Sequence, residues 1–312
     1  MDWFDRRQVA HAFSRAAQRY DNAAKLQRAI DANLMESLDY LEDSGFNGRK
    51  PEVIVDAGSG TGMSSRMLQA RWPEATVLSV DTAQGMLRHG RAPAPTLGER
   101  AKAIFRKTPN APIAVNADVR NLPFADSSVD LIYSNLCLQW IEDLQGALNG
   151  FRRVLKPGGM LLFSTFGPET LFELRDAFAE ADDRSHVSPF ANIQQWGDAL
   201  VATGFRNPVL DRDVTVEGHK DLNSLMRNLK DIGATNALAD RRRTLTGRAR
   251  FERATQAYER LRDTQTGDIP ATWEVIYATA WAPDADQPIR EKGVDVVRIP
   301  VQQLKVRKRI RE

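Results

Sequence analysis

The sequence predicts an α/β protein with a doubly wound, mostly parallel sheet. Two observations lead to this prediction. From residue 53 onward, short apolar segments of strand length alternate with segments of helical periodicity, and the first of these strands runs directly into a glycine-rich turn. Such alternation is typical of a parallel sheet covered by helices on both faces. With 312 residues, the chain is long enough for one large domain of this kind and an appended or inserted helical part.

The N-terminal region is expected to be helical. Residues 6–20 place a set of apolar side chains on one helical face. The side chains on this face are Val9, Phe13, Ala16 and Tyr20. A second helix is expected at about residues 23–41, followed by a loop rich in Gly, Asn and Ser at residues 43–51. We therefore predict that residues 1–45 form a helical cap in front of the α/β domain.

The α/β pattern itself begins at residue 53. Strands are expected at residues 53–55, 76–80, 113–116, 129–134 and 160–165, and helices at residues 64–71, 83–91 and 144–155. The last of these helices ends where Pro157 and two glycines follow, because both residue types stop helices. Residues 91–110 contain several prolines and are expected to form an extended surface connection.

The C-terminal part is expected to add two helices and two strands to this pattern. The helices are expected at residues 169–181 and 193–203, and the strands at residues 209–216 and 273–281. More than 50 residues separate these two strands, whereas a simple connection needs only a few. We therefore predict a helical lid, residues 218–268, inserted into a main domain of residues 46–282. Residues 283–312 are expected to form a polar, basic tail.

Composition and charge exclude several classes of protein. The net charge of +2 is too small to indicate a nucleic-acid-binding protein. The single cysteine, Cys137, excludes an internal disulfide and suits a reducing compartment. No apolar run approaches the roughly 18 residues that a membrane-spanning helix needs, and no signal-peptide pattern follows Met1. We expect a cytoplasmic protein that has neither nucleic acid nor membrane as a partner.

The strongest functional signal is the segment Val-Ile-Val-Asp-Ala-Gly-Ser-Gly-Thr-Gly at residues 53–62. A strand that runs into closely spaced glycines lets the backbone approach a ligand at the carboxyl end of a sheet. A dinucleotide fingerprint would require glycine at position 63, which is Met63. Asp56 lies two residues before Gly58, where a carboxylate repels a pyrophosphate but can accept a hydrogen bond from an ammonium group. The segment therefore favours a cofactor with an amino-acid group over NAD.

Polar residues also follow the neighbouring strands. Asp81 ends the second strand, where a carboxylate can accept hydrogen bonds from both hydroxyls of a ribose, and it equally suits the N-cap of the next helix. Asp118 and Val119 follow the third strand at positions suited to an adenine amine and ring, and Asn135 ends the fourth. Because such strand ends meet at the topological switch point, we expect one ligand site there.

Taken as a set, these motifs resemble the class I S-adenosylmethionine-dependent methyltransferase family. The matching segments are residues 56–62, Asp81, Asp118, residues 130–135 and residues 154–159. The resemblance implies a Rossmann-like, seven-stranded methyltransferase sheet and S-adenosylmethionine as cofactor. It also implies that Asp56 and the glycine loop hold the methionine moiety, that Asp81 holds the ribose, and that Asp118 and Val119 hold the adenine.

Two residues of the N-terminal helices are further candidates. The hydroxyl of Tyr20 either faces the cofactor, as a residue that can take part in catalysis, or belongs to the core. Gln27 reaches the cofactor if the first helices fold over the cleft. The predicted cofactor-binding residues are then Asp56, Gly58, Gly60, Asp81, Thr82, Met86, Asp118, Val119, Asn135, Tyr20 and Gln27. The four histidines show no metal-ligand spacing, so no metal site is expected.

Segments outside the cofactor motifs resemble the malonyl-acyl carrier protein O-methyltransferases of biotin synthesis. These segments are residues 10–21, 26–28 and 225–236. The resemblance implies methyl transfer to the free carboxylate of a malonyl thioester, giving the methyl ester that primes pimeloyl synthesis. Because a carboxylate is already ionised at neutral pH, this reaction needs no general base.

The same resemblance implies an acidic acyl carrier protein as partner. Basic residues in the expected lid suit its docking surface. These residues are Arg227, Lys230, Arg241, Arg242 and Arg243. A merely solvated helix face is the alternative, because Asp231 and Asp240 are interspersed with them.

Two other functions stay open at this point. Residues 167–171, 186–190 and 270–273 also resemble the methyltransferase-like assembly factors of respiratory complex I, which implies modification of a protein arginine by hydroxylation. A non-catalytic protein that keeps the cofactor fold for partner binding is the other alternative. The intact set of Asp56, Gly58, Gly60 and Asp81 argues against it.

Overall fold

The structure, a computed structural model, describes residues 3–45, 49–90, 111–181, 183–241, 247–285, 289–291 and 294–296. The predicted connection at residues 91–110, the predicted docking residues Arg242 and Arg243, and most of the predicted tail therefore lie outside the described residues. Among the helices of the described part, none is long and apolar enough to span a membrane.

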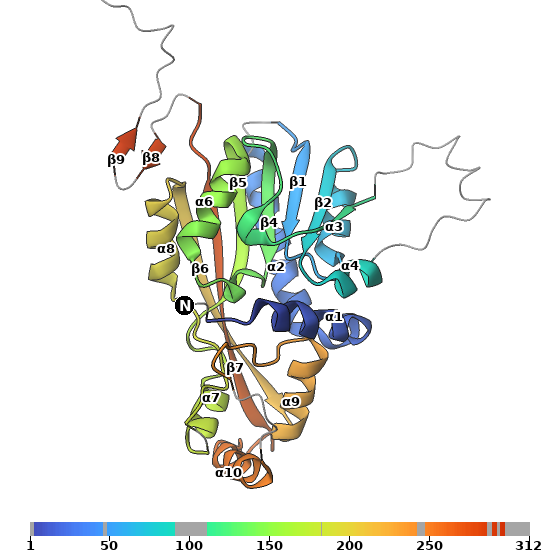
Figure 1. Cartoon of the computed structure of the whole chain (residues 1–312), viewed down its shortest axis with the longest axis vertical. Coiled ribbons are helices and arrows are strands. Elements are labelled where there is room, and N and C mark those ends of the chain that lie inside the picture. The colour runs from blue at the N-terminus through green and yellow to red at the C-terminus, as the bar shows by residue number, and fades with distance from the viewer. Residues whose placement is uncertain are drawn as a thin grey trace, which may run out of the picture.

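A seven-stranded sheet in the order β3-β2-β1-β4-β5-β7-β6 forms the centre of the molecule (Figure 1). Its strands are β1 (Val53–Ala57), β2 (Thr76–Asp81), β3 (Ile113–Asn116), β4 (Val129–Asn135), β5 (Leu155–Phe166), β6 (Arg206–His219) and β7 (Ile269–Trp281). The first five strands are mutually parallel, and β7 runs antiparallel to both β5 and β6. The predicted doubly wound, mostly parallel, seven-stranded sheet is confirmed. A separate antiparallel pair, β8 (Ile289–Glu291) and β9 (Val294–Val296), follows it.

Helices cover both faces of the sheet and its lower end. They are α1 (Arg6–Ala23), α2 (Lys25–Gly45), α3 (Met63–Arg71), α4 (Gln84–Gly90), α6 (Leu144–Val154), α7 (Phe172–Ala179), α8 (Ile193–Ala202), α9 (Leu222–Asp231) and α10 (Arg248–Glu259), with 3₁₀ turns η1 (Val119–Asn121) and η2 (Leu138–Trp140). Side-chain caps explain several starting points: Asp5 caps α1, Asp143 caps α6, and Asp221 forms a capping box with Ser224 on α9.

Several boundaries differ from the prediction, and those of β5, α7, β6 and β7 have a clear physical reason. Strand β5 begins at Leu155 because this residue pairs with Val129 before the register shifts. Helix α7 begins only at Phe172 because Leu171 adopts a left-handed φ of 54°. Strands β6 and β7 are longer than expected, since their outer halves pair with each other beyond the rest of the sheet.

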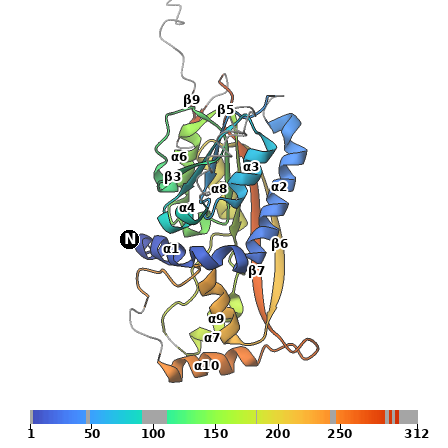
Figure 2. The same cartoon turned by 90° about the vertical axis from the view of Figure 1, so that its right-hand side faces the viewer.

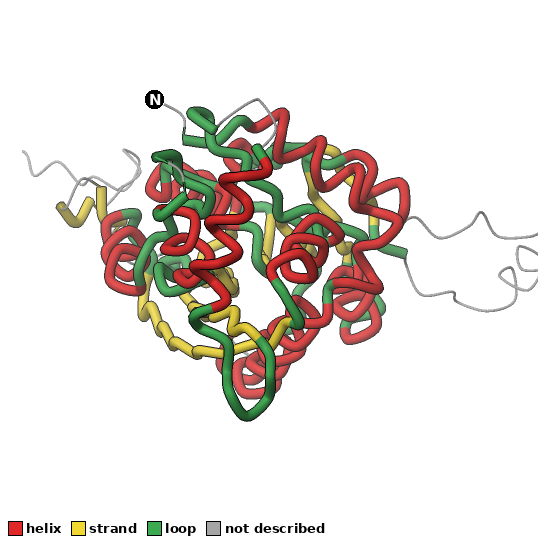
Figure 3. The backbone as a smooth tube through the Cα atoms, turned by 90° about the horizontal axis from the view of Figure 1, so that it is seen from below, coloured by secondary structure: helices red, strands yellow, loops and turns green. Residues whose placement is uncertain are grey.

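The apolar core has three main parts. One lies between the sheet and helices α6 and α8, and includes Phe151 and Trp196. Another lies on the opposite face, where α2 and α3 bury Leu34 and Leu68. The third joins α7, α9 and α10 to the outer half of β7. Figure 3, seen from below, places this helical end nearest the viewer.

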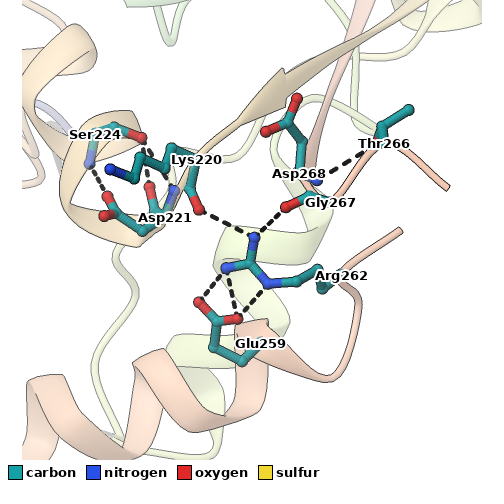
Figure 4. A network of polar contacts seen from close by, with 8 residues as sticks. All are labelled: Lys220, Asp221, Ser224, Glu259, Arg262, Thr266, Gly267 and Asp268. Atoms are coloured by element: carbon teal, nitrogen blue, oxygen red, sulfur yellow. Dashed lines mark hydrogen bonds and ion pairs between the residues drawn. The ribbon is translucent and has the colours of Figure 1, made fainter. Parts of the chain in front are cut away.

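The chain between β6 and β7 contains α9 and α10, and its two ends are held together by Arg262 (Figure 4). The guanidinium of Arg262 donates to both carboxylate oxygens of Glu259, at 2.7 and 2.6 Å. It also donates to the carbonyl oxygens of Lys220, at 3.0 Å, and Gly267. This contact joins the end of α10 to the residue after β6 and to the turn before β7.

Helix α1 lies across the carboxyl ends of the parallel strands. Figure 1 and Figure 2 both place it between the α/β part of the molecule and helix α9. Gly85 of α4 packs directly on Ser14 of α1, and Gly233, after α9, packs on Phe13. The N-terminal helices therefore fold over the end of the sheet where the predicted ligand residues lie.

Candidate active site

A cavity of about 140 Å³ lies at the carboxyl ends of β1, β2 and β4. It gathers nine of the eleven predicted cofactor-binding residues. These are Tyr20, Gly58, Gly60, Asp81, Thr82, Met86, Asp118, Val119 and Asn135. Gln27 lines two smaller neighbouring cavities. The order of the strands in the sheet thus brings their polar ends together, and helix α1 closes the space above them.

The glycine loop approaches the cavity because its backbone has conformations that favour glycine. Gly58 has a φ of 79° and Gly60 a φ of 55°. The Gly58 amide donates a hydrogen bond of 2.8 Å to the carbonyl oxygen of Val80, which ties the loop to β2. A Cβ atom on Gly58 would lie 2.3 Å from the Cβ and Sγ atoms of Cys137. No other residue type fits at this position.

Asp81 accepts two backbone hydrogen bonds, one at the start of the next helix and one from the glycine loop. Its Oδ1 accepts a hydrogen bond of 2.7 Å from the Ala83 amide, and its Oδ2 accepts one of 2.9 Å from the Gly60 amide. Burial raises the pKa of the Asp81 carboxyl above its ordinary value, and the two backbone hydrogen bonds oppose that rise. Because a carboxylate has about four acceptor positions, Asp81 retains acceptor capacity toward the cavity.

Asp118 is held by a neighbouring cation. Arg120 donates to both of its carboxylate oxygens, from Nε at 2.9 Å to Oδ1 and from Nη2 at 2.7 Å to Oδ2. Partial burial tends to raise the pKa of this carboxyl, but the hydrogen bonds and charge of Arg120 lower it below its ordinary value. Asp118 is therefore an ionised acceptor of fixed orientation at the cavity wall.

Asp56 is the one predicted residue that the structure turns away from the cavities. Its side chain is 1% exposed, and its Oδ2 accepts a hydrogen bond of 2.5 Å from the hydroxyl of Ser65 on α3. The Ser65 hydroxyl also accepts one of 2.6 Å from Ser79 on β2. The expected direct contact with an ammonium group is replaced by a link between β1, β2 and α3. This change arises because α3 begins directly after the glycine turn and covers the carboxylate.

Two aspartates of the N-terminal helices belong to this site but were missed by sequence reasoning. Asp31 of α2 is 1% exposed and accepts hydrogen bonds from Tyr133 at 2.6 Å and from Ser64 at 2.9 Å. Asp21 of α1 accepts one of 2.6 Å from Thr61. No local motif marks either residue, since both reach the site only through the packing of α1 and α2.

Tyr20 stands at the junction of these groups, and it lines the main cavity and both smaller ones. Burial raises the pKa of its hydroxyl above the ordinary value, and the negative charges of Asp81, Asp21 and Asp31 raise it further. Tyr20 is therefore a neutral phenol and a hydrogen-bond donor near neutral pH. Of these carboxylates only Asp81 lines the main cavity, whose other charged lining residues are Asp118, Arg6 and Arg120.

The residue after β4 is strained. Leu136 has a φ of 50°, in the left-handed region that a branched side chain seldom adopts. Its amide donates a hydrogen bond of 3.1 Å to the carbonyl oxygen of Ser164 on β5. Leu136 lines both the main cavity and the next one, so this strain lies where the two cavities meet.

A second cavity, of about 90 Å³, adjoins the main one. The two share Phe13, Tyr20, Leu136 and Trp140. The walls of the second cavity are mainly apolar and aromatic, with Phe166, Leu171, Leu174, Phe190, Leu229, Ile232 and Trp273. Among the described residues that line it there is no Lys, Arg, Asp or Glu. A small ligand in this cavity would lie beside whatever fills the first.

The predicted docking residues are in different environments. Arg227 and Lys230 are exposed on α9, whose opposite face is buried. Arg241 has a side chain only 16% exposed and forms an ion pair of 3.0 Å with Asp5. Arg241 thus makes an internal contact.

The main cavity fits S-adenosylmethionine by its chemistry. Its lining combines the carboxylates of Asp81 and Asp118 with the guanidinium groups of Arg6 and Arg120, which suits a ligand that has a sulfonium, an ammonium group and a carboxylate. Asp81 offers acceptors for ribose hydroxyls, and Asp118 offers an acceptor for an amine. Val119 and Met86 supply apolar surface for a flat ring, and both are buried.

Fold and cavity together define a class I methyltransferase that uses S-adenosylmethionine. A family model described as "Methyltransferase domain" matches residues 55–163. A malonyl-acyl carrier protein O-methyltransferase of Xylella fastidiosa is 49% identical over 98% of each chain, and one of Nitrosospira multiformis is 42% identical over 90% of each. The chain belongs to the malonyl-acyl carrier protein O-methyltransferase family.

A solved structure agrees on the fold. The crystal structure of the YcgJ protein from Bacillus subtilis has a TM-score of 0.52 and 16% sequence identity, and the match covers 80% of this chain and 100% of that one. At this identity the likeness concerns the fold alone. Family membership supports an O-methyltransferase over the two alternatives, the arginine-modifying assembly factor and the non-catalytic binding protein.

Proposed function

We propose that this protein transfers the methyl group of S-adenosylmethionine to the free carboxylate of malonyl-acyl carrier protein. The observation that carries the proposal is the pair of adjoining cavities, one lined by charged and polar residues of the strand ends and one mainly apolar, that share Tyr20 and Leu136. The relatives with the same named activity support it. The methyl ester would prime pimeloyl synthesis for biotin in the cytoplasm.

In the proposed reaction a carboxylate oxygen forms a bond to the methyl carbon while the carbon–sulfur bond breaks. The electron pair of that bond stays on sulfur, and no proton moves. When bound, S-adenosylmethionine supplies an activated methyl group on a sulfonium cation. The acceptor is already ionised at neutral pH, so the protein needs no general base.

The proposed work of the protein is alignment and exclusion of water. We assign the ribose to Asp81 and the adenine to Asp118 and Val119. The glycine loop at Gly58 and Gly60 would hold the methionine moiety. Tyr20, a neutral donor at the junction of the cavities, would orient the acceptor carboxylate.

Helices α1 and α2 and the insertion with α9 and α10 would act together as the cover of this site. The acidic carrier protein would dock on the exposed cations of α9. Arg227→Glu combined with Lys230→Glu should raise the KM for malonyl-acyl carrier protein about tenfold or more. Activity toward a malonyl thioester without a carrier protein should stay unchanged, whereas an unchanged KM would exclude α9 as the docking surface.

The function is tested directly by intact-protein mass spectrometry. Purified protein is incubated with S-adenosylmethionine and malonyl-acyl carrier protein, and acetyl-acyl carrier protein serves as the control. A mass gain of one methylene unit on the malonyl carrier alone supports the proposal. No gain, in a protein that still binds the cofactor by calorimetric titration, contradicts it.

A further inference from the structure

Buried polar atoms without a hydrogen-bond partner gather around the second cavity. Among the described residues, they include three donors, the indole Nε1 of Trp140, the indole Nε1 of Trp273 and the hydroxyl of Thr235, and one acceptor, the amide Oε1 of Gln139. Trp273 is 2% exposed and lies on β7, Trp140 ends η2, and Thr235 follows α9. Three elements far apart in the sequence thus contribute polar groups to the wall of one apolar cavity.

Such groups indicate the chemistry of a ligand. Buried polar atoms in folded proteins nearly always find a partner, because leaving one unpaired is costly. An indole N–H can only donate, and a threonine hydroxyl can donate. A ligand that satisfies the three donors must therefore present acceptor oxygens. A carboxylate and a thioester carbonyl, the two ends of a malonyl thioester, both do so.

The charges around the second cavity narrow the choice of ligand further. No Lys or Arg is among the described residues that line it, so an anion there would meet neutral donors. The adjoining cavity is lined by Asp81 and Asp118 and also by Arg6 and Arg120, so these charges balance, and a bound cationic cofactor would add a positive charge beside the second cavity. When bound in the main cavity, S-adenosylmethionine would supply a full positive charge on its sulfonium.

We propose that the second cavity binds the malonyl carboxylate through the neutral donors Trp140 and Trp273, with the bound cofactor as its counter-charge. This inference rests on the proposed function and specifies how the acceptor is recognised. A carboxylate held in this way is not masked by a salt bridge and stays a good nucleophile. Methyl transfer removes both charges at once, so the neutral ester and thioether lose their mutual attraction and separate.

One test compares two buried tryptophans. Trp273→Phe removes the indole N–H and keeps an aromatic ring in the wall of the second cavity. Trp196→Phe is the matched control, because Trp196 is equally buried, also has an unpaired Nε1, and packs on Phe163 in the core, away from both cavities. We expect Trp273→Phe to lower kcat/KM for malonyl-acyl carrier protein about tenfold or more. Trp196→Phe should leave it within about twofold of the unchanged protein.

Two further measurements separate lost recognition from lost structure. The Kd of S-adenosylhomocysteine, from titration calorimetry, should be unchanged in Trp273→Phe. Inhibition by acetyl-acyl carrier protein, which has no carboxylate, should also be unchanged. Trp140→Phe should show the same selective loss toward the malonyl carrier. If Trp273→Phe does not fold, Trp140→Phe provides the kinetic test.

The counter-charge is tested with the unchanged protein. Malonyl-acyl carrier protein should bind about tenfold or more tightly to the complex with sinefungin, in which a CH–NH3+ group replaces the S+–CH3 group, than to the complex with S-adenosylhomocysteine, whose sulfur is neutral. Equal affinity for the two complexes would overturn the role assigned to the cofactor charge.

The outcomes distinguish this inference from the proposed function. An unchanged protein that binds the cofactor but does not methylate the malonyl carrier overturns both. A second outcome overturns the inference alone. In it the unchanged protein is active, Trp273→Phe and Trp140→Phe behave like Trp196→Phe, and His186→Gln abolishes recognition of the malonyl carrier. The His186 imidazole, which also lines the second cavity, would then be the partner of the carboxylate.

Discussion

Asp5 and Arg241 form an ion pair of 3.0 Å across 236 positions of the chain. Beside this pair, the Asp5 amide donates a hydrogen bond of 2.8 Å to the carbonyl oxygen of Ala237, and Phe4 and Leu238 form an antiparallel bridge. Asp5 also caps α1, the helix that covers the cofactor cavity. The segment after α9 therefore holds the start of α1 in place, and it does so at the edge of the site.

The first prediction concerns this link. Arg241→Ala should weaken cofactor binding about three- to tenfold, because a smaller fraction of the protein then has α1 closed over the cavity. Titration with S-adenosylhomocysteine measures this loss. Arg248→Ala is the control, since Arg248 pairs with Glu252 on α10 and its side chain is 92% exposed. Equal affinity in the two variants would exclude a closing role for the ion pair.

The second prediction concerns the glycine loop. Gly58→Ala should abolish detectable cofactor binding, because the new Cβ collides with Cys137 and the backbone φ of 79° disfavours alanine. Gly247→Ala tests the same change where a Cβ meets nothing within 4 Å. We expect that control to bind the cofactor normally. Calorimetry on both variants, with circular dichroism to verify folding, decides the point.

The third prediction concerns Asp81. Asp81→Ala should weaken cofactor binding about 100-fold or more, since hydrogen bonds to a charged acceptor contribute about 1.5–3 kcal/mol each. Asp126→Ala is the matched control, because the Asp126 side chain is 74% exposed and forms a surface ion pair with Arg153. A Kd for Asp81→Ala near that of the control would show that the ribose lies elsewhere.

The fourth prediction concerns pH. Burial, joined by the nearby charges of Asp31 and Asp81, raises the pKa of the Asp56 carboxyl from 3.8 to about 7. The folded protein therefore binds a proton that the unfolded chain releases, and stability falls as pH rises from about 4 to about 7 through this group. In cofactor-free protein, Asp56→Asn should lessen the decrease in unfolding temperature between pH 5.5 and pH 8 by roughly 2–6 °C.

Differential scanning fluorimetry at both pH values measures this effect. Asp126→Asn serves as the control, because the Asp126 carboxyl is far more exposed than that of Asp56. In this variant the unfolding temperature should depend on pH as it does in the unchanged protein. If Asp56→Asn and Asp126→Asn show the same slope, the Asp56 carboxyl titrates outside this range.

Much of the fold was predictable because its signals are local. The apolar strand at Val53–Ala57 and the amphipathic helix at Leu144–Val154 are visible as short periodic patterns, and the structure has both. The boundaries that differ depend on pairing. Leu155 joins β5 only because Val129 lies opposite it, and the length of β6 follows from its pairing with β7.

By itself, the sequence determined which polar residues gather at the strand ends, where the cofactor site is predicted. Glycine at positions 58 and 60 and carboxylates at the ends of parallel strands meet at one edge of any sheet with this order. Only the tertiary structure decided which way each side chain faces. Asp56 turned toward Ser65 because α3 covers it, and Asp31 came to the site because α2 packs against β4. The second cavity joins Phe13 to Trp273, and no local pattern encodes such a contact, since it depends on long-range packing.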